Sequence, residues 1–183
     1  RPGEPSLHLD HGDLQFAPRR ALQTVLLLHV HADGRLQLRA DEPAQVRLKV
    51  FSRGRQMPLS ERVPMIEDMG FRVISEDTFD IAPEGGVATW LHDMLLTRAR
   101  EGAVDVATLK PQIEALLGAL FRGAIESDGY NALTLEAGIG WRDVAMLRAL
   151  SRYLRQARIG FSQDYMWRTL AAHPALARKL VDL

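Results

Sequence analysis

The spacing of the glycines in this chain does not match a nucleotide-binding enzyme. A dinucleotide-binding unit usually carries Gly-x-Gly-x-x-Gly between a strand and a helix, because glycine lets the backbone approach the pyrophosphate. The nearest approaches are Gly85-Gly86, which lacks the spacing, and Gly138-Ile139-Gly140, which joins two predicted helices without a preceding strand. The sequence also contains no P-loop, nucleophile elbow or His-Glu-x-x-His pair. We therefore predict no catalytic and no cofactor-binding residues in this chain.

Histidines and carboxylates that could bind a metal or exchange a proton do occur. His8, Asp10 and His11 lie in a proline-rich stretch where nothing nearby completes a ligand set, so we predict no metal site. His92 and Asp93 point to opposite faces of a predicted strand and cannot act together. The acidic residues of the following set are typical of solvated faces and turns: Glu61, Glu67, Asp68, Glu76, Asp77 and Asp80.

The clearest helical pattern runs from Trp141 to Arg158. Its apolar residues form one broad face at helical spacing, namely Met146, Ala149, Leu150, Tyr153, Leu154 and Ala157. Roughly opposite lies a stripe of Arg148, Ser151, Arg152, Arg155 and Arg158. Three interpretations of these arginines stay open: salt bridges to a neighbouring domain or subunit, a solvated face, or contacts with nucleic acid. We take Arg148, Arg152, Arg155 and Arg158 as candidate interface residues, and expect the aromatic residues Trp141, Tyr153, Tyr165 and Trp167 to anchor helix packing.

The elements around this helix predict an α+β fold. Further helices are expected at about 130–137, 162–172 and 175–181, and upstream at 60–69 and 109–121. Strands are expected at 24–31, 46–50 and 87–96, and residues 71–81 are expected to form one strand or a broken pair of strands. A hairpin turn is expected at Asp33-Gly34, with a return strand through Leu36 and Leu38. The order strand–helix–strand–strand–helix is most of a ferredoxin-like unit. The final strand of that unit is missing, and the early hairpin is a candidate for its place in the sheet.

Composition limits the range of functions. The 183 residues have 46% hydrophobic and 25% charged residues and a net charge of +0, which is typical of a globular protein and gives no general attraction to nucleic acid or an anionic membrane. The chain has no cysteine, which excludes disulfides and thiolate chemistry and fits a reducing cytoplasm. The longest apolar run, residues 25–28, is too short to span a bilayer. We predict three parts: an irregular lead-in at 1–23, an α+β module at 24–122 and a helical segment at 123–183.

A series of short motifs, in order, resembles the large bacterial NAD-specific glutamate dehydrogenases over about residues 46–183. The motifs are Pro58-Leu59-Ser60-Glu61, Gly70-Phe71-Arg72-Val73-Ile74, Asp128-Gly129-Tyr130-Asn131, Leu135-Glu136-Ala137-Gly138, Trp141-Arg142-Asp143-Val144, Leu147-Arg148-Ala149, Tyr153-Leu154-Arg155-Gln156 and Phe161-Ser162-Gln163-Asp164-Tyr165. The resemblance implies an internal piece of such an enzyme, with an ACT-like module followed by a helical region. NAD would serve the whole enzyme and bind outside this piece. The implied partners are the remaining domains, including the catalytic domain, and further copies of the chain in a homo-oligomer.

ACT-like modules commonly hold small amino acids where the first strand turns into the first helix. By this resemblance the candidate effector-binding residues are Ser52, Arg53, Gly54 and Arg55. Gly54 would let the backbone approach a ligand, and the arginines could meet a carboxylate; a plain glycine turn is the alternative. The expected function is a non-catalytic regulatory or assembly region of a cytoplasmic enzyme. The alternatives are a stand-alone ACT-like amino-acid sensor and a nucleic-acid-binding helical protein.

Overall fold

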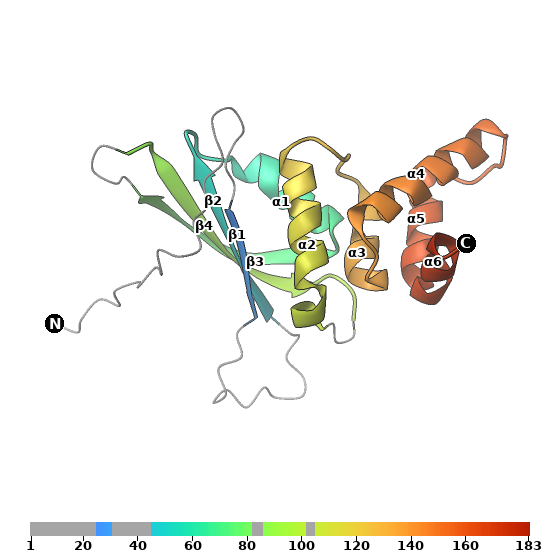
Figure 1. Ribbon diagram of the computed structural model, residues 1–183, viewed down its shortest axis with the longest axis horizontal. Helices are drawn as coiled ribbons and strands as arrows, with labels where there is room; N and C mark the ends of the chain where they lie inside the picture. The colour runs from blue at the N-terminus through green and yellow to red at the C-terminus, as the bar shows by residue number, and fades with distance from the viewer. Residues whose placement is uncertain (1–24, 31–44, 82–85, 102–104) are drawn as a thin grey trace.

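A computed structural model describes residues 25–30, 45–81, 86–101 and 105–183 of the chain. The first half forms a sheet with helices on one face, and the second half forms a group of helices beside it (Figure 1). The sheet part comprises β1 (Val25–Val30), β2 (Gln45–Arg53), α1 (Leu59–Asp68), β3 (Phe71–Ile81), β4 (Thr89–Arg98) and α2 (Val106–Phe121). The helical part comprises a short 3-10 helix, η1 (Gly129–Asn131), and α3 (Ala132–Ala137), α4 (Trp141–Gln156), α5 (Gln163–Ala172) and α6 (Pro174–Val181).

The sheet has four antiparallel strands in the order β1-β2-β4-β3. The segment β2–α1–β3–β4–α2 follows the ferredoxin-like order predicted from the sequence. β1 pairs with β2 from Val25↔Phe51 to Val30↔Val46, so it occupies the edge where the missing final strand would lie. The early strand thus completes the sheet as predicted. The predicted turn at Asp33-Gly34 and its return strand lie outside the described residues.

The core of the sheet part follows from alternation along the strands. Val46, Leu48 and Val50 of β2 are buried at every second position, as expected for a strand with one face covered. They pack with Met94 and Leu96 of β4 and with buried residues of the helices α1 and α2, namely Ile66, Ile113, Leu116, Leu117 and Leu120. A register shift between Val73 and Ser75 interrupts β3, which is therefore one irregular strand and not a separate pair.

The helical part has its own core, and one of its helices also contributes to the core of the sheet part. Tyr130, Leu133, Val144, Leu147 and Ala171 belong to a second buried cluster. Leu135 of α3, however, belongs to the core of the sheet part. Polar contacts cross the same junction: Ser127 Oγ donates to Asp68 Oδ2 at 2.7 Å, and Arg98 forms an ion pair with Glu136. The two parts are therefore packed together.

The orientation of α4 differs from the one that its apolar pattern suggests. Val144, Leu147, Arg148 and Ser151 are the residues that α4 buries. The predicted apolar face is instead largely exposed, with exposed fractions of 46% for Met146, 44% for Leu150 and 65% for Tyr153. Trp141 and Trp167 pack against the two cores as expected, but Tyr153 and Tyr165 are exposed and do not anchor helix packing.

Candidate functional site: a polar cluster beside the β2–α1 connection

The inward face of the sheet changes from apolar to polar at one end. Along β2, the buried series Val46, Leu48, Val50 ends in Ser52, which is fully buried. Along β4, the buried residues Leu96 and Met94 are followed on the same face by His92, which is also fully buried. His92 lies opposite Thr78 of β3 in the register. Buried polar side chains need hydrogen-bond partners, so this end of the sheet requires a polar cover.

Helix α1 supplies that cover with Arg62, which is only 2% exposed. Its Nη2 donates to Oε1 of Glu76, and the same oxygen accepts a hydrogen bond from Thr78 Oγ1 at 3.0 Å. Thr78 Oγ1 also lies 3.0 Å from His92 Nδ1, and Ser52 Oγ lies 3.2 Å from His92 Nε2. We call Ser52, Arg62, Glu76, Thr78 and His92 the polar cluster.

The contacts of His92 fit a neutral imidazole. Burial is the main cause that lowers the pKa of His92 below its usual value, and the positive charge of Arg62 lowers it further, against an opposing effect of Glu76. Thr78 donates its one hydroxyl proton to Glu76, so it can only accept from His92. Nδ1 then carries the imidazole proton, and Nε2 accepts from Ser52.

A groove of about 480 Å³ opens beside the cluster, at the connection between β2 and α1. Its lining includes Arg62, Glu76 and Thr78, together with the apolar side chains of Met57 and Leu59. Among the described residues, Arg62 Nε and Nη1 and Glu76 Oε2 are buried without a hydrogen-bond partner. Two residues that line the groove thus keep unused hydrogen-bonding atoms, although the atoms themselves are buried beside the Arg62–Glu76 ion pair. A zwitterion has the complementary groups, a carboxylate and an ammonium.

The four predicted effector-binding residues immediately precede the segment that lines this groove, and none of them lines it. Ser52 belongs to the polar cluster, whereas Arg53 and Arg55 are exposed. Arg55 bonds to both carboxylate oxygens of Glu61, at 3.3 and 3.0 Å. Gly54 has a φ of 88° and donates its N–H to Ala88 O at 2.8 Å, while a Cβ there would meet nothing within 4 Å. The turn therefore needs glycine for its left-handed backbone and not for a close approach.

Sequence reasoning missed the central members of the cluster. It placed Glu76 on a solvated face, but the Glu76 side chain is only 9% exposed and faces Arg62. It correctly placed His92 and Asp93 on opposite faces, and Asp93 pairs with Arg47 and Lys49 at 3.4 and 3.2 Å. A signal was available: Arg62 stands one helical turn before the buried Ile66, so it lies on the buried face of α1.

The predicted arginine stripe divides into buried and exposed members. Arg148 is 4% exposed, and its guanidinium bonds to both oxygens of Asp128 at 2.7 Å and to Asn131 Oδ1 at 2.8 Å. Arg152 forms an ion pair with Glu126 at the surface. Arg148 is therefore a link within the helical part and is removed from the candidate interface. Arg155 and Arg158 are exposed at the far end of α4.

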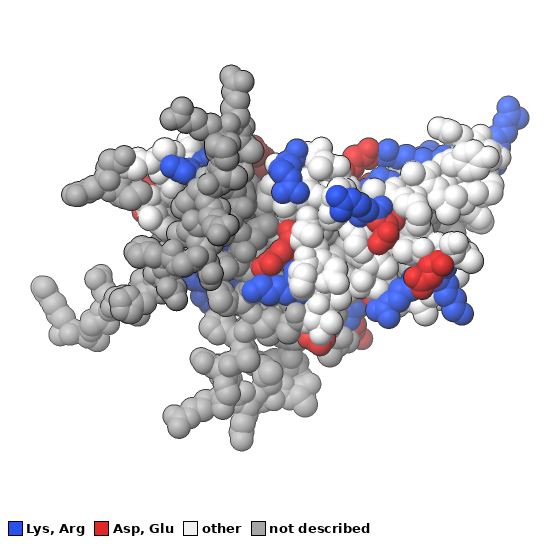
Figure 2. Space-filling view, in the orientation of Figure 1, with Lys and Arg blue, Asp and Glu red and all other residues white. Residues whose placement is uncertain are grey.

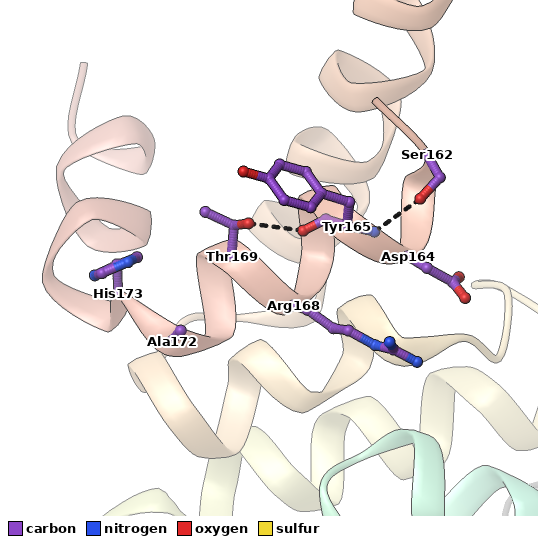
Figure 3. A pocket seen from close by; sticks show the side chains of 7 residues that line it. All are labelled: Ser162, Asp164, Tyr165, Arg168, Thr169, Ala172 and His173. Carbon is purple, nitrogen blue, oxygen red and sulfur yellow. Dashed lines mark hydrogen bonds between the residues drawn. The ribbon is translucent and has the colours of Figure 1, made fainter. Parts of the chain in front are cut away.

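A second hollow runs along α5 (Figure 3). Its polar groups serve their own helix: Ser162 Oγ accepts from the N–H of Tyr165 at 3.1 Å, and Thr169 Oγ1 donates to Tyr165 O at 2.8 Å. The side chains of Asp164 and Arg168 lie away from Thr169 and His173 in this view. The hollow therefore lacks converging unused groups, unlike the groove beside the polar cluster.

The described ranges contain no group of three or more histidine, cysteine or acidic side chains placed to hold a metal ion. No helix within them is both long and apolar enough to cross a membrane.

The fold is a ferredoxin-like sheet with its two helices, packed beside a group of helices. Two family models match, the ACT3 domain of glutamate dehydrogenase over residues 33–109 and helical motif 3 of glutamate dehydrogenase over residues 125–183. Both models describe parts of glutamate dehydrogenase, so the chain belongs to the glutamate dehydrogenase family, as the sequence motifs suggested.

Curated relatives support the same assignment. The chain is 40% identical over 144 residues to the NAD-specific glutamate dehydrogenase of Halomonas elongata, a match that covers 78% of the chain. It is 36% identical to the enzymes of the same name from Pseudomonas aeruginosa over 139 residues and Mycobacterium tuberculosis over 149 residues, with 76% and 78% of the chain covered. In each case the chain spans about 9% of the length of the relative.

Proposed function

We propose that this chain is a non-catalytic regulatory and assembly region of a NAD-dependent glutamate dehydrogenase. The whole enzyme would oxidise L-glutamate with NAD to 2-oxoglutarate, ammonia and NADH. The short share of each relative that the chain spans supports this assignment. The sequence has no Gly-x-Gly-x-x-Gly motif that fits NAD, so NAD would bind elsewhere in the polypeptide. The enzyme would be cytoplasmic and homo-oligomeric, with the other domains of the polypeptide as partners of this region.

We propose further that the groove beside the polar cluster binds a small amino acid as an effector. The observation that carries this proposal is that Arg62 and Glu76 both line the groove and both keep buried hydrogen-bonding atoms without a partner, which a ligand would reach by entering between them. The α-carboxylate would bind Arg62, and the α-ammonium would bind Glu76. Met57 and Leu59 would contact the ligand's side chain. The proposed site would lie just after Ser52–Arg55 in the chain, with Ser52 hydrogen-bonded to His92 of the polar cluster.

Titration calorimetry of the chain with each common amino acid tests the site. We expect one amino acid or a small group to bind with a micromolar to millimolar dissociation constant. Glu76→Gln keeps the size of the side chain but removes the charge that pairs with an ammonium, so it should weaken binding at least about tenfold. Arg55→Gln is the matched control, because Arg55 is exposed and already paired with Glu61. Binding that Glu76→Gln leaves unchanged would refute this site.

The same variants in the full-length enzyme separate a regulatory region from a stand-alone sensor. If the chain regulates catalysis, the amino acid that binds it should change the rate of NADH formation, and Glu76→Gln should abolish that change. A binding site that never alters the rate would favour a sensing module without an enzymatic role. The nucleic-acid alternative loses support because Arg148 and Arg152 are already paired with carboxylates.

A further inference from the structure

Strand β3 forms one edge of the sheet, and among the described residues it pairs only with β4. Edge strands are commonly protected by short length, lysine or proline, whereas β3 has 11 residues and contains neither lysine nor proline. The register shift between Val73 and Ser75 lies near its start and leaves residues 75–81 as a regular run opposite β4. We call residues 75–81 the open edge. Its backbone groups that point away from β4 can pair with an added strand.

The side chains of the open edge are largely exposed, although one of them is large and apolar. Asp77, Thr78, Phe79 and Asp80 are all exposed, and the exposed fraction of Phe79 is 51%. Phe79 lies opposite Leu91 of β4, which is only 6% exposed. The apolar surface of the sheet therefore reaches its edge at Phe79, where a neighbouring strand would cover it.

The open edge also carries negative charge that this chain leaves without a partner. Asp77 and Asp80 form no ion pair with any residue that the structure describes. Asp93, directly opposite Asp77, binds both cations of the neighbouring strand, Arg47 and Lys49. Basic side chains, blue in Figure 2, run along the upper side of α4 to its tip, at the end of the molecule away from the sheet. A basic partner for the open edge would therefore come from outside the described ranges.

The open edge specifies the composition of the strand that fits it, because paired strands place their side chains directly opposite one another. Asp77 and Phe79 share one face of the sheet, and Asp80 lies on the other. The complement is an extended segment with lysine or arginine opposite each aspartate and an apolar side chain opposite Phe79. A second copy of the open edge fits poorly, because antiparallel pairing centred on Thr78 would set Glu76 against Asp80.

We propose that the open edge binds an extended basic segment from another part of the same polypeptide, which adds a strand to the sheet. The proposal rests on the proposed function, in which this chain is one region of a longer enzyme. The chain spans about 9% of the length of its relatives, so ample polypeptide exists to provide the segment. A tethered segment is present at high effective concentration and needs only modest affinity for the edge.

Hydrogen exchange of the full-length polypeptide tests the proposal. Mass spectrometry follows peptides that cover residues 75–81 in the wild type and in the double variant Asp77→Lys/Asp80→Lys, which reverses both charges. Glu67→Lys is the matched control, because Glu67 is an exposed carboxylate on α1 and not on the open edge. Strand β2 is paired on both sides, so slow exchange of its peptides shows that the domain remains folded.

In an unpaired edge strand about half of the amides point away from the sheet and exchange freely, whereas a docked strand protects them as well. We expect protection of both halves in the wild type, and exchange of the outer half at least about tenfold faster in the double variant than in the wild type or Glu67→Lys. Freely exchanging outer amides in the wild type would overturn the proposal. Protection that the double variant leaves unchanged would refute a basic occupant, and an equal effect of Glu67→Lys would show only a general loosening.

A photo-cross-link identifies the source of the segment. Phe79→p-benzoylphenylalanine places a photoreactive ring at an exposed position of the open edge. We expect the cross-linked peptide to contain lysine or arginine and to come from outside residues 1–183. A cross-link to residues 1–183, in the same copy or in a second one, would refute the proposal. Neither measurement needs an amino acid or catalysis, so a failure here is distinct from a failure of the proposed function.

Discussion

The contact between Gly129 and Trp167 should be among the least tolerant of substitution in the helical part. A Cβ added at Gly129 would lie 2.3 Å from Trp167 Cε2 and 2.6 Å from both Cδ2 and Cζ2. These distances are well inside van der Waals contact, and Trp167 packs against the second core, so the indole must move. Overpacking of this kind costs about 1–3 kcal/mol. We therefore expect Gly129→Ala to lower the free energy of unfolding by about 2 kcal/mol.

Urea unfolding followed by far-ultraviolet circular dichroism measures this loss. Gly160→Ala is the matched control, because a Cβ at Gly160 would meet nothing within 4 Å; it should leave stability unchanged or raise it by less than about 1 kcal/mol. In a Trp167→Ala background the added Gly129→Ala should cost less than about 0.5 kcal/mol, because the colliding ring is gone. A full loss that persists without the indole would refute the steric explanation.

Two further perturbations probe the buried charges. Arg148→Met removes the partner of Asp128, and we expect it to lower the free energy of unfolding, measured with urea, by about 3 kcal/mol. The control Arg155→Met, at an exposed position, should change the free energy of unfolding by no more than about 0.5 kcal/mol. Equal losses for the two variants would contradict the structural role of Arg148. His92 has a pKa below its usual 6.5 in the folded chain, so the unfolded chain binds protons more readily. The contribution of His92 to stability should therefore be complete above about pH 6.5 and decline as the pH falls below it, as urea midpoints between about pH 8 and 5 would show. His92→Gln should remove that part of the slope, and an unchanged slope would show that other groups cause it.

Much of the fold follows from local patterns. The alternation at Val46, Leu48 and Val50 correctly predicts a strand with one buried face, and Gly70 correctly marks the end of α1. The buried side of α4 does not follow from its periodicity, because periodicity reports only the most apolar side of a helix. The side that α4 buries includes Arg148, whose burial depends on Asp128 and Asn131 of a different segment. The sequence of α4 alone therefore does not reveal which side of the helix is buried.

The polar cluster of the candidate site is likewise not predictable from any single segment of the sequence. Its members come from β2, α1, β3 and β4, and only the sheet register and the placement of α1 bring them together. Individually, Glu76 and Arg62 have the ordinary charged character of surface residues. Family resemblance drew attention to the exposed arginines of the turn after β2, whereas the buried arginine, Arg62, lies in the helix that follows.

The position of β1 in the sequence matters for the choice of boundaries when this domain is produced on its own. The ACT3 match begins at residue 33, after β1 ends at Val30. A protein trimmed to the boundary of that match would lose β1, and the backbone N–H and C=O groups of β2 that bond to it would become an open sheet edge. Such an edge readily accepts another extended chain, so the trimmed domain should aggregate or capture a foreign strand. A functional boundary for the isolated domain therefore lies before Val25.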